Sequence, residues 1–92
     1  MIKSFKHKGL KRFFETGSTA GIIPAHEDSL RKCLASIHQA ENITDLNLPS
    51  LRLHRLKGDR KDIWSVTVRA NWRITFQFTD GDAYILNYED YH

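Results

Sequence analysis

The fold of this chain is decided by residues 64–79, WSVTVRANWRITFQFT. Apolar and polar residues alternate in both halves of this stretch, and a short break at 70–72 separates the halves. Side chains two positions apart on a strand point to the same face of a sheet. The pattern therefore predicts two antiparallel strands, 64–69 and 73–79, with one apolar and one polar face.

Further strands are expected on both sides of this pair. Asp80-Gly81 is a strong two-residue hairpin signal, so residues 83–88 are expected to form the next strand. Upstream, residues 51–54 alternate and are followed by a turn composition at 57–60. Residues 1–5 alternate weakly and are expected to form a short edge strand.

The first half of the chain has helical periodicity instead. Apolar residues recur at helical spacing over 8–15, which predicts a helix there. Gly17 follows at the position of a left-handed C-terminal cap. A second helix is expected over 25–40, because Pro24 suits the first turn and an apolar stripe follows. Cys33 falls in that stripe, so it is expected to be a small core residue rather than a nucleophile.

These elements predict one α+β domain over residues 1–92, with two N-terminal helices packed on an antiparallel sheet of about four to five strands. No apolar run approaches the roughly 18 residues of a membrane span. The basic N-terminus is not followed by the apolar stretch of a signal peptide. One cysteine excludes an internal disulfide framework, so we expect a cytoplasmic protein.

Charge is distributed unevenly along the chain. Residues 1–14 and residues 52–73 each carry a net charge of +5, whereas 15–51 carries −3 and 74–92 carries −4. Separate basic zones suit a polyanion such as RNA or an acidic partner protein. A merely solvated charged surface is the alternative.

The polar sheet face supplies residues suited to metal-free RNA cleavage. Alternation allows His54, Arg69 and Arg73 to converge from neighbouring strands, while Asp90 and His92 point the same way at the chain end. Histidine transfers protons near neutral pH, and the arginine fork matches phosphate oxygens. Taken alone, each of these residues is equally consistent with an ordinary solvent-exposed side chain that has no catalytic role. No histidine or cysteine spacing indicates a metal site, and no glycine-rich phosphate loop is present.

The run 64–76, the terminal Asp90-Tyr91-His92, the opening Ile2-Lys3-Ser4-Phe5 and the segment LHRLKGDR at 53–60 together resemble the HigB branch of the RelE/ParE toxin superfamily. The resemblance covers essentially the full length and is weakest over 17–50. It implies a RelE-like fold similar to microbial ribonucleases. It also implies a ribosome-dependent messenger-RNA endonuclease that needs no cofactor and is held inactive by a HigA-type helix-turn-helix antitoxin.

The resemblance also implies roles for particular residues. The matching catalytic candidates are His54, Arg73, Asp90, Tyr91 and His92. The matching RNA contacts are Lys57, Arg69 and Asn71.

Two other functions remain open from the sequence. A toxin of the same fold without nuclease chemistry, such as a gyrase poison or a ribosome blocker, would share most of these features. The paired proton carriers His54 and His92 argue against it, because pure binding does not need them. A DNA-binding repressor is disfavoured because no helix-turn-helix pattern is visible.

Overall fold

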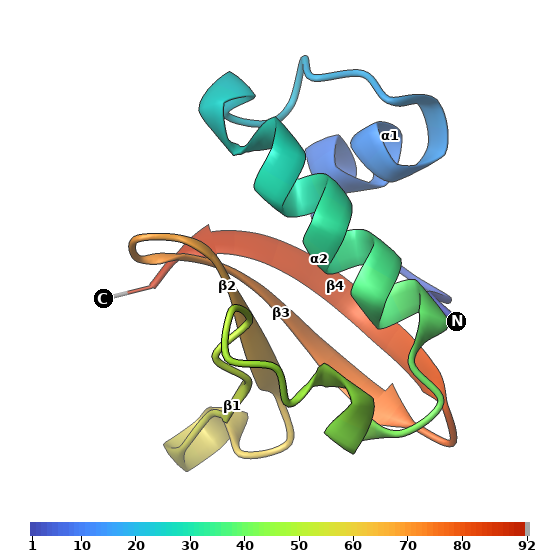
Figure 1. The fold of residues 1–92 in the computed structure, drawn as a ribbon, viewed down its shortest axis with the longest axis vertical. Coiled ribbons are helices and arrows are strands. Elements are labelled where there is room, and N and C mark those ends of the chain that lie inside the picture. The colour runs from blue at the N-terminus through green and yellow to red at the C-terminus, as the bar shows by residue number, and fades with distance from the viewer. Residues whose placement is uncertain (92) are drawn as a thin grey trace.

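The computed structural model of the protein describes residues 1–91; His92, a catalytic candidate from the sequence, lies outside the described residues. The two α-helices lie in the first half of the chain and the four strands in the second (Figure 1). The elements in order are α1 (Lys8–Thr16), η1 (Pro24–His26), α2 (Glu27–Gln39), η2 (Ile43–Leu46), β1 (His54–Arg55), η3 (Gly58–Arg60), β2 (Trp64–Arg69), β3 (Trp72–Thr79) and β4 (Asp82–Asp90).

The four strands form one antiparallel sheet in the order β1-β2-β3-β4, which confirms the predicted fold class. β2 has the predicted bounds, and β3 begins one residue before the predicted start. Asp80 and Gly81 both have positive φ (51° and 82°), as a two-residue type I′ turn requires. β4 extends the predicted strand by one residue at its start and two at its end.

Two predicted strands are shorter than expected. The alternating segment 51–54 contributes only its last residue to β1, because Arg52 has a φ of 48°, which interrupts the extended backbone. The N-terminal segment forms two isolated bridges to β4, Ile2 to Ala83 and Phe5 to Leu86, instead of a continuous edge strand.

The two predicted helices are confirmed, with one addition. Gly17 ends α1 with a φ of 80°, and its N–H donates to the carbonyl of Phe13. The second helix starts as the 3-10 turn η1, with Pro24 at its first position, and continues as α2. The short helix η2 was not predicted; the side chains of Asn42 and Asp45 close a capping box around its first turn.

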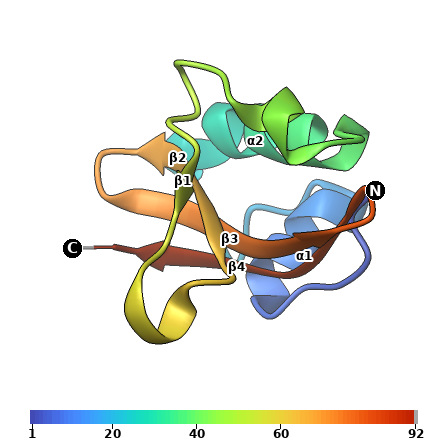
Figure 2. The same cartoon turned by 90° about the horizontal axis from the view of Figure 1, so that it is seen from below.

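The molecule has two layers. α2 lies across one face of the sheet, and α1 packs against β4 (Figures 1 and 2). Figure 2 shows the η3 segment on the opposite side of the sheet from α2. The core lies between the layers and includes the fully buried side chains of Leu10, Leu30, Ile37, Leu46, Val66, Ile74, Phe76 and Leu86.

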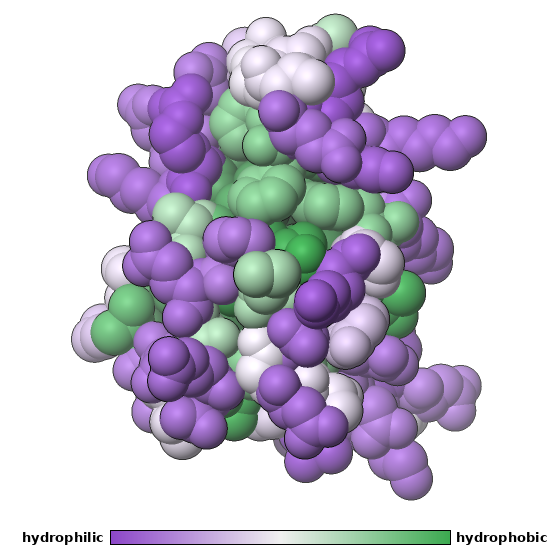
Figure 3. Space-filling view, turned by 90° about the vertical axis from the view of Figure 1, so that its right-hand side faces the viewer, coloured by the Kyte–Doolittle hydropathy of each residue, from purple (hydrophilic) through white to green (hydrophobic). Residues whose placement is uncertain are grey.

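Apolar surface also reaches solvent near α1. Figure 3 shows it in the middle of one face of the molecule, enclosed by hydrophilic side chains. Phe13, Phe14 and Leu34 line a shallow cavity of about 290 Å³ between α1 and α2. No helix within residues 1–91 combines the length and apolar character that crossing a membrane requires.

The loop that follows α1 folds back onto the helix start through two glycines. A Cβ atom placed on Gly9 would lie 2.4 Å from the carbonyl oxygen of Gly21, and one placed on Gly21 would lie 2.5 Å from the Cα of Gly9. Both contacts are backbone to backbone, so no flexible side chain can move aside.

We predict that Gly9→Ala lowers the free energy of unfolding by about 1–3 kcal/mol, because the added methyl group forces the loop off the helix. Urea denaturation measures the change. Lys8→Ala, at the exposed neighbouring position, serves as the control and should stay within about 0.5 kcal/mol of wild type. Equal stability of the two variants would show that the loop does not press on α1.

Candidate active site

Two rows of polar side chains cross the sheet on the face away from α2. Residues directly opposite one another in an antiparallel ladder lie on the same face, so the strand register defines each row. The first row contains His54, Ser65, Thr75 and Asn87, and the second contains Thr67, Arg73 and Glu89.

Arg73 is a half-buried cation near the centre of this face. Its Nη1 donates a hydrogen bond to Oγ of Ser65 at 3.3 Å, and its guanidinium carbon lies 5.4 Å from the centroid of the Tyr91 ring. Tyr91 is fixed by its own backbone N–H, which donates to the carbonyl of Asn71 at 2.8 Å. His54 is paired with Ser65 in the register, so the structure brings three of the predicted residues to one face: His54, Arg73 and Tyr91.

Two polar atoms in the second row are buried without a hydrogen-bond partner within residues 1–91. They are Nε of Arg73 and Oγ1 of Thr67, which are opposite each other in the β2–β3 register. Such atoms cost stability and are rare in folded proteins. Their concentration beside the candidate residues is typical of a functional site rather than of a structural one.

Glu89 is a central residue of this face that the sequence did not reveal. The two terminal guanidinium nitrogens of Arg60, Nη1 and Nη2, donate to its carboxylate at 2.9 Å. The side chains of Thr75 and Asn87 donate to the same group at 2.9 and 3.0 Å. The Arg60 guanidinium is the main reason that the pKa of Glu89 is lowered, although partial burial opposes the shift. This bidentate pair ties the η3 segment to β4.

A change of register explains why Glu89 was missed. Counting outward from the Asp80-Gly81 turn pairs Phe78 with Ala83, and the same count would place Tyr88 opposite Arg73. An irregularity in the β3–β4 pairing between Thr75 and Gln77 adds one residue on β4, so Glu89 becomes the partner of Arg73. Alternation alone carries no signal for this bulge.

The prediction that Arg69 lies on the polar face with His54 and Arg73 is wrong. The β2–β3 register shifts between Thr67 and Arg69, so Arg69 is paired with Trp72 instead of continuing the polar row. Its positive charge acts on His26, whose pKa it helps to lower. Arg69 therefore does not converge with His54 and Arg73.

The remaining predicted residues lie around the end of the sheet. Asp90 is paired with Trp72, so within β4 it points to the face opposite Glu89. Asn71 is in the exposed β2–β3 turn, and Lys57 is exposed just before η3.

A second cluster lies on the helix side of this sheet end. His26 is only 6% exposed, and its Nδ1 shares a hydrogen bond of 2.5 Å with the hydroxyl of Tyr88. Trp72 packs on Tyr88 with ring centroids 4.9 Å apart. Burial, and then the charge of Arg69, lower the pKa of His26. The cluster thus joins the start of α2 to β3 through Trp72 and to β4 through Tyr88, near the sheet end that is followed by Tyr91.

Cys33 is a core residue, as predicted. It is 3% exposed, and burial raises the pKa of its thiol to about 11. In residues 1–91, no three His, Cys, Asp or Glu side chains are grouped as ligands for a metal ion.

Comparison with known proteins identifies relatives along the full chain. Residues 3–92 match the HigB-like toxin family, described as RelE-like toxin of type II toxin–antitoxin system HigB. The chain is 61% identical over 92 residues to Endoribonuclease HigB of Proteus vulgaris, with 100% of both chains covered. It is 33% identical over 94 residues to Toxin HigB-1 of Vibrio cholerae serotype O1, with 100% of this chain and 98% of the relative covered.

Solved structures show the same fold at low identity. A mutant of YafQ from E. coli superposes with a TM-score of 0.60 at 16% identity, over 98% of this chain and 91% of that one. A copper-bound mutant toxin from Helicobacter pylori superposes with a TM-score of 0.62, also at 16% identity, over 98% and 94% of the two chains. At this identity the likeness concerns the fold alone.

The His26–Tyr88 pair predicts an acid-sensitive fold. Because the pKa of His26 is lowered from 6.5 in the folded protein, the unfolded chain binds more protons as the pH falls through that value. The free energy of unfolding therefore decreases on acidification from about pH 7.5 to about pH 5.5. His26→Gln should make this dependence shallower, measured by urea denaturation at each pH; part of it remains because burial also lowers the pKa of His7. Cys33→Ala, a buried change in α2 that does not titrate in this range, should leave the slope unaltered; an unchanged slope in His26→Gln would exclude the mechanism.

The Arg60–Glu89 pair predicts a measurable coupling. We expect a double-mutant cycle with Arg60→Gln and Glu89→Gln to give a coupling energy of about 1 kcal/mol, a value discounted because the Arg60 side chain is 43% exposed. The exposed Arg31–Glu27 pair in α2 is the matched comparison and should couple more weakly. Equal coupling in the two pairs would mean that the further donors to Glu89, Thr75 and Asn87, add nothing.

Proposed function

The chain belongs to the HigB-like family of RelE-like toxins of type II toxin–antitoxin systems, and from this premise we propose that it is an endoribonuclease that cleaves messenger RNA in the decoding site of the ribosome. The observation that carries the proposal is the arrangement of Arg73, with Tyr91 against its guanidinium and Ser65 linking it to the row of His54. The endoribonuclease name of the 61% identical relative supports the same activity.

The electrostatics of the polar face suit a phosphodiester. Arg60 is neutralised by Glu89, whereas Arg73 hydrogen-bonds a neutral hydroxyl and faces an aromatic ring. Its charge is therefore not cancelled by a carboxylate in these contacts. A guanidinium stays protonated and stabilises the extra negative charge on a five-coordinate phosphorus.

The chemistry that we propose uses the nucleophile within RNA. The 2′-oxygen attacks the adjacent phosphorus, a base removes the 2′-hydroxyl proton, the bond from phosphorus to the 5′-oxygen breaks, and an acid protonates that oxygen. Each positioned proton transfer contributes about 10²–10⁴ in rate. We propose His54, Tyr91 and His92 as the groups that carry these protons. Asp90 was a further candidate from the sequence, but it points to the other face of the sheet, so we assign it no proton transfer at Arg73.

Glu89 is unsuited to the role of base. Its carboxylate already accepts hydrogen bonds from Arg60, Thr75 and Asn87, and the Arg60 charge lowers its pKa. A lowered pKa makes a weaker proton acceptor. We infer that Glu89 holds the face together and takes no proton from the substrate.

Two kinds of partner are proposed for this chain: RNA and an antitoxin protein. Lys57 and Asn71 are exposed near the polar face and the sheet end, and we propose them, with Arg69 at the same end, as contacts to message or ribosomal RNA. Family membership implies an antitoxin partner. We propose that it is a HigA-type protein with a helix-turn-helix domain.

Mapping new 5′ ends of cellular messages after brief induction tests the function. We expect cuts within translated coding regions and none in messages whose start codon is removed. Arg73→Gln should reduce cutting by roughly 10²–10³-fold, the loss typical of one oxyanion donor. Arg12→Gln, an exposed change on α1, is the matched control and should cut normally. Growth arrest with intact messages would favour the non-nucleolytic alternative, and normal cutting by Arg73→Gln would remove the proposed role of that residue.

A further inference from the structure

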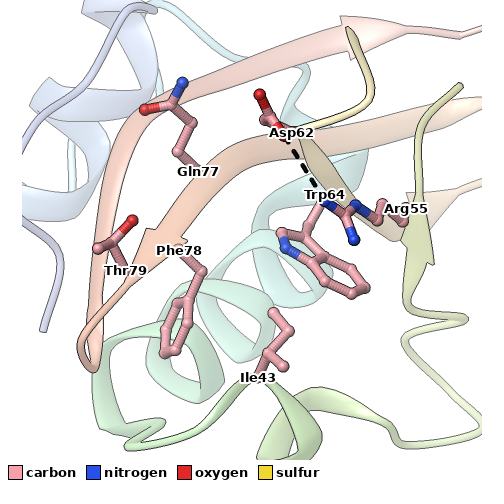
Figure 4. A pocket seen from close by; sticks show the side chains of 7 residues that line it. All are labelled: Ile43, Arg55, Asp62, Trp64, Gln77, Phe78 and Thr79. Carbon is pink, nitrogen blue, oxygen red and sulfur yellow. Dashed lines mark ion pairs between the residues drawn. The ribbon is translucent and has the colours of Figure 1, made fainter. Parts of the chain in front are cut away.

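We propose that a pocket beside the free end of β3 binds an unpaired nucleobase of RNA, away from the bond that is cut. The pocket has a volume of about 490 Å³, within the roughly 300–1,000 Å³ of typical small-ligand sites. It is lined by Ile43, Arg55, Asp62, Trp64, Gln77, Phe78 and Thr79 (Figure 4). The inference rests on the proposed action on RNA.

The pocket exists because two neighbouring strands differ in length. The β2–β3 register begins with Trp64 opposite Phe76, yet β3 continues to Thr79. The last three residues of β3 therefore have no β2 partner, and β2 leaves a gap in the sheet beside them. η2, through Ile43, closes the gap on the helix side.

Flat side chains form the walls of the pocket. Figure 4 shows the rings of Trp64 and Phe78 projecting into the same space, with Ile43 beside them. Both rings are partly buried at the margin of the core, so their orientations are held by packing. Unpaired bases bind proteins by stacking on such aromatic faces. Packing against the core leaves part of the Trp64 ring in the pocket.

Arg55 is held over the Trp64 ring by three contacts. Its guanidinium carbon lies 5.6 Å from the Trp64 ring centroid, its Nε donates to the carbonyl of Lys61 at 2.7 Å, and an ion pair of 3.5 Å joins it to Asp62. Arginine planes stack on bases as aromatic rings do. Because these contacts already restrict the side chain, little rotamer freedom remains to be lost on binding.

The rim of the pocket can read the edge of a base. Asp62 accepts hydrogen bonds, Gln77 donates and accepts through its amide, and Thr79 does both through its hydroxyl. Exocyclic amino groups and ring nitrogens of bases require this mixture of donors and acceptors. An apolar ligand would offer Gln77 and Thr79 no hydrogen-bond partner.

The position of the pocket suits an RNA strand that also crosses the active face. Arg55 and His54 are adjacent on the edge strand β1 and point to opposite faces of the sheet. Along β3, Arg73 and Gln77 are four residues apart, which corresponds to about 13 Å of strand. A base in the pocket and a phosphate at Arg73 therefore lie within a few nucleotides of each other around one sheet edge.

Binding of two RNA probes tests the proposal. One probe is a single-stranded oligonucleotide with a 2′-O-methyl group on every nucleotide, so that it cannot be cut; the other is vacant 70S ribosomes. We expect Trp64→Leu and Phe78→Leu to weaken binding of at least one probe by roughly 5- to 100-fold, the loss that follows from removing base stacking. A loss of affinity for the oligonucleotide identifies the message as the source of the base. A loss of affinity for vacant ribosomes identifies ribosomal RNA as the source.

Phe14→Leu is the matched control, because Phe14 is also partly buried against the core but lines the cavity between the helices. It should bind both probes within about twofold of wild type, and thermal melts should show that all three variants are folded. Should Trp64→Leu unfold the protein, Phe78→Leu and Arg55→Gln carry the test.

The outcomes separate this inference from the proposed function. Unchanged affinity of the folded variants for both probes overturns the pocket assignment, even if the protein cuts messages. Weaker binding of the purified antitoxin alone would show a protein-docking site and would overturn it equally. If the wild-type protein cuts no message but the pocket variants lose RNA affinity, the nuclease proposal fails and the pocket assignment stands.

Discussion

Strand register determines which side chains meet in this protein, and the register changes twice. One shift lies between β2 and β3, near Arg69, and the other lies between β3 and β4, near Gln77. Each extra residue exchanges the faces of everything that follows it. The first shift removes Arg69 from the polar face, and the second brings Glu89 opposite Arg73. The composition of the candidate site is therefore a consequence of two local backbone irregularities.

This register places two arginines near one carboxylate, and the carboxylate forms its ion pair with only one of them. Arg60 and Arg73 both reach the row that contains Glu89, but only Arg60 forms a bidentate pair with the carboxylate. Thr75 and Asn87 also hydrogen-bond Glu89, and they help to keep the carboxylate in place. Within residues 1–91, the contacts of the Arg73 guanidinium are with the Ser65 hydroxyl and the Tyr91 ring. A cation placed in this way is costly without a ligand and becomes favourable when an anion binds.

The sequence predicted what depends on periodicity and local turn chemistry. The two helices, the strand pair over 64–79, the Asp80-Gly81 turn and the burial of Cys33 all follow from spacing or composition, and the structure confirms them. It did not predict features that depend on one backbone angle or on one inserted residue. The positive φ of Arg52 shortened β1, and the bulges relocated Arg69 and concealed Glu89.

The unequal strand lengths have a consequence beyond the candidate active face. At one end of the sheet, β3 and β4 converge with the His26–Tyr88 cluster, and that end is fixed to α2 by buried contacts. At the other end, β3 extends beyond β2. The space beside it is lined by side chains and is not filled by a strand. Arg73 and the pocket residue Gln77 belong to the same strand, so the strand rise sets their spacing at about 13 Å. If a base occupies the pocket and a phosphate binds Arg73, as proposed, this spacing fixes how many nucleotides separate the bound base from the bond that is cut.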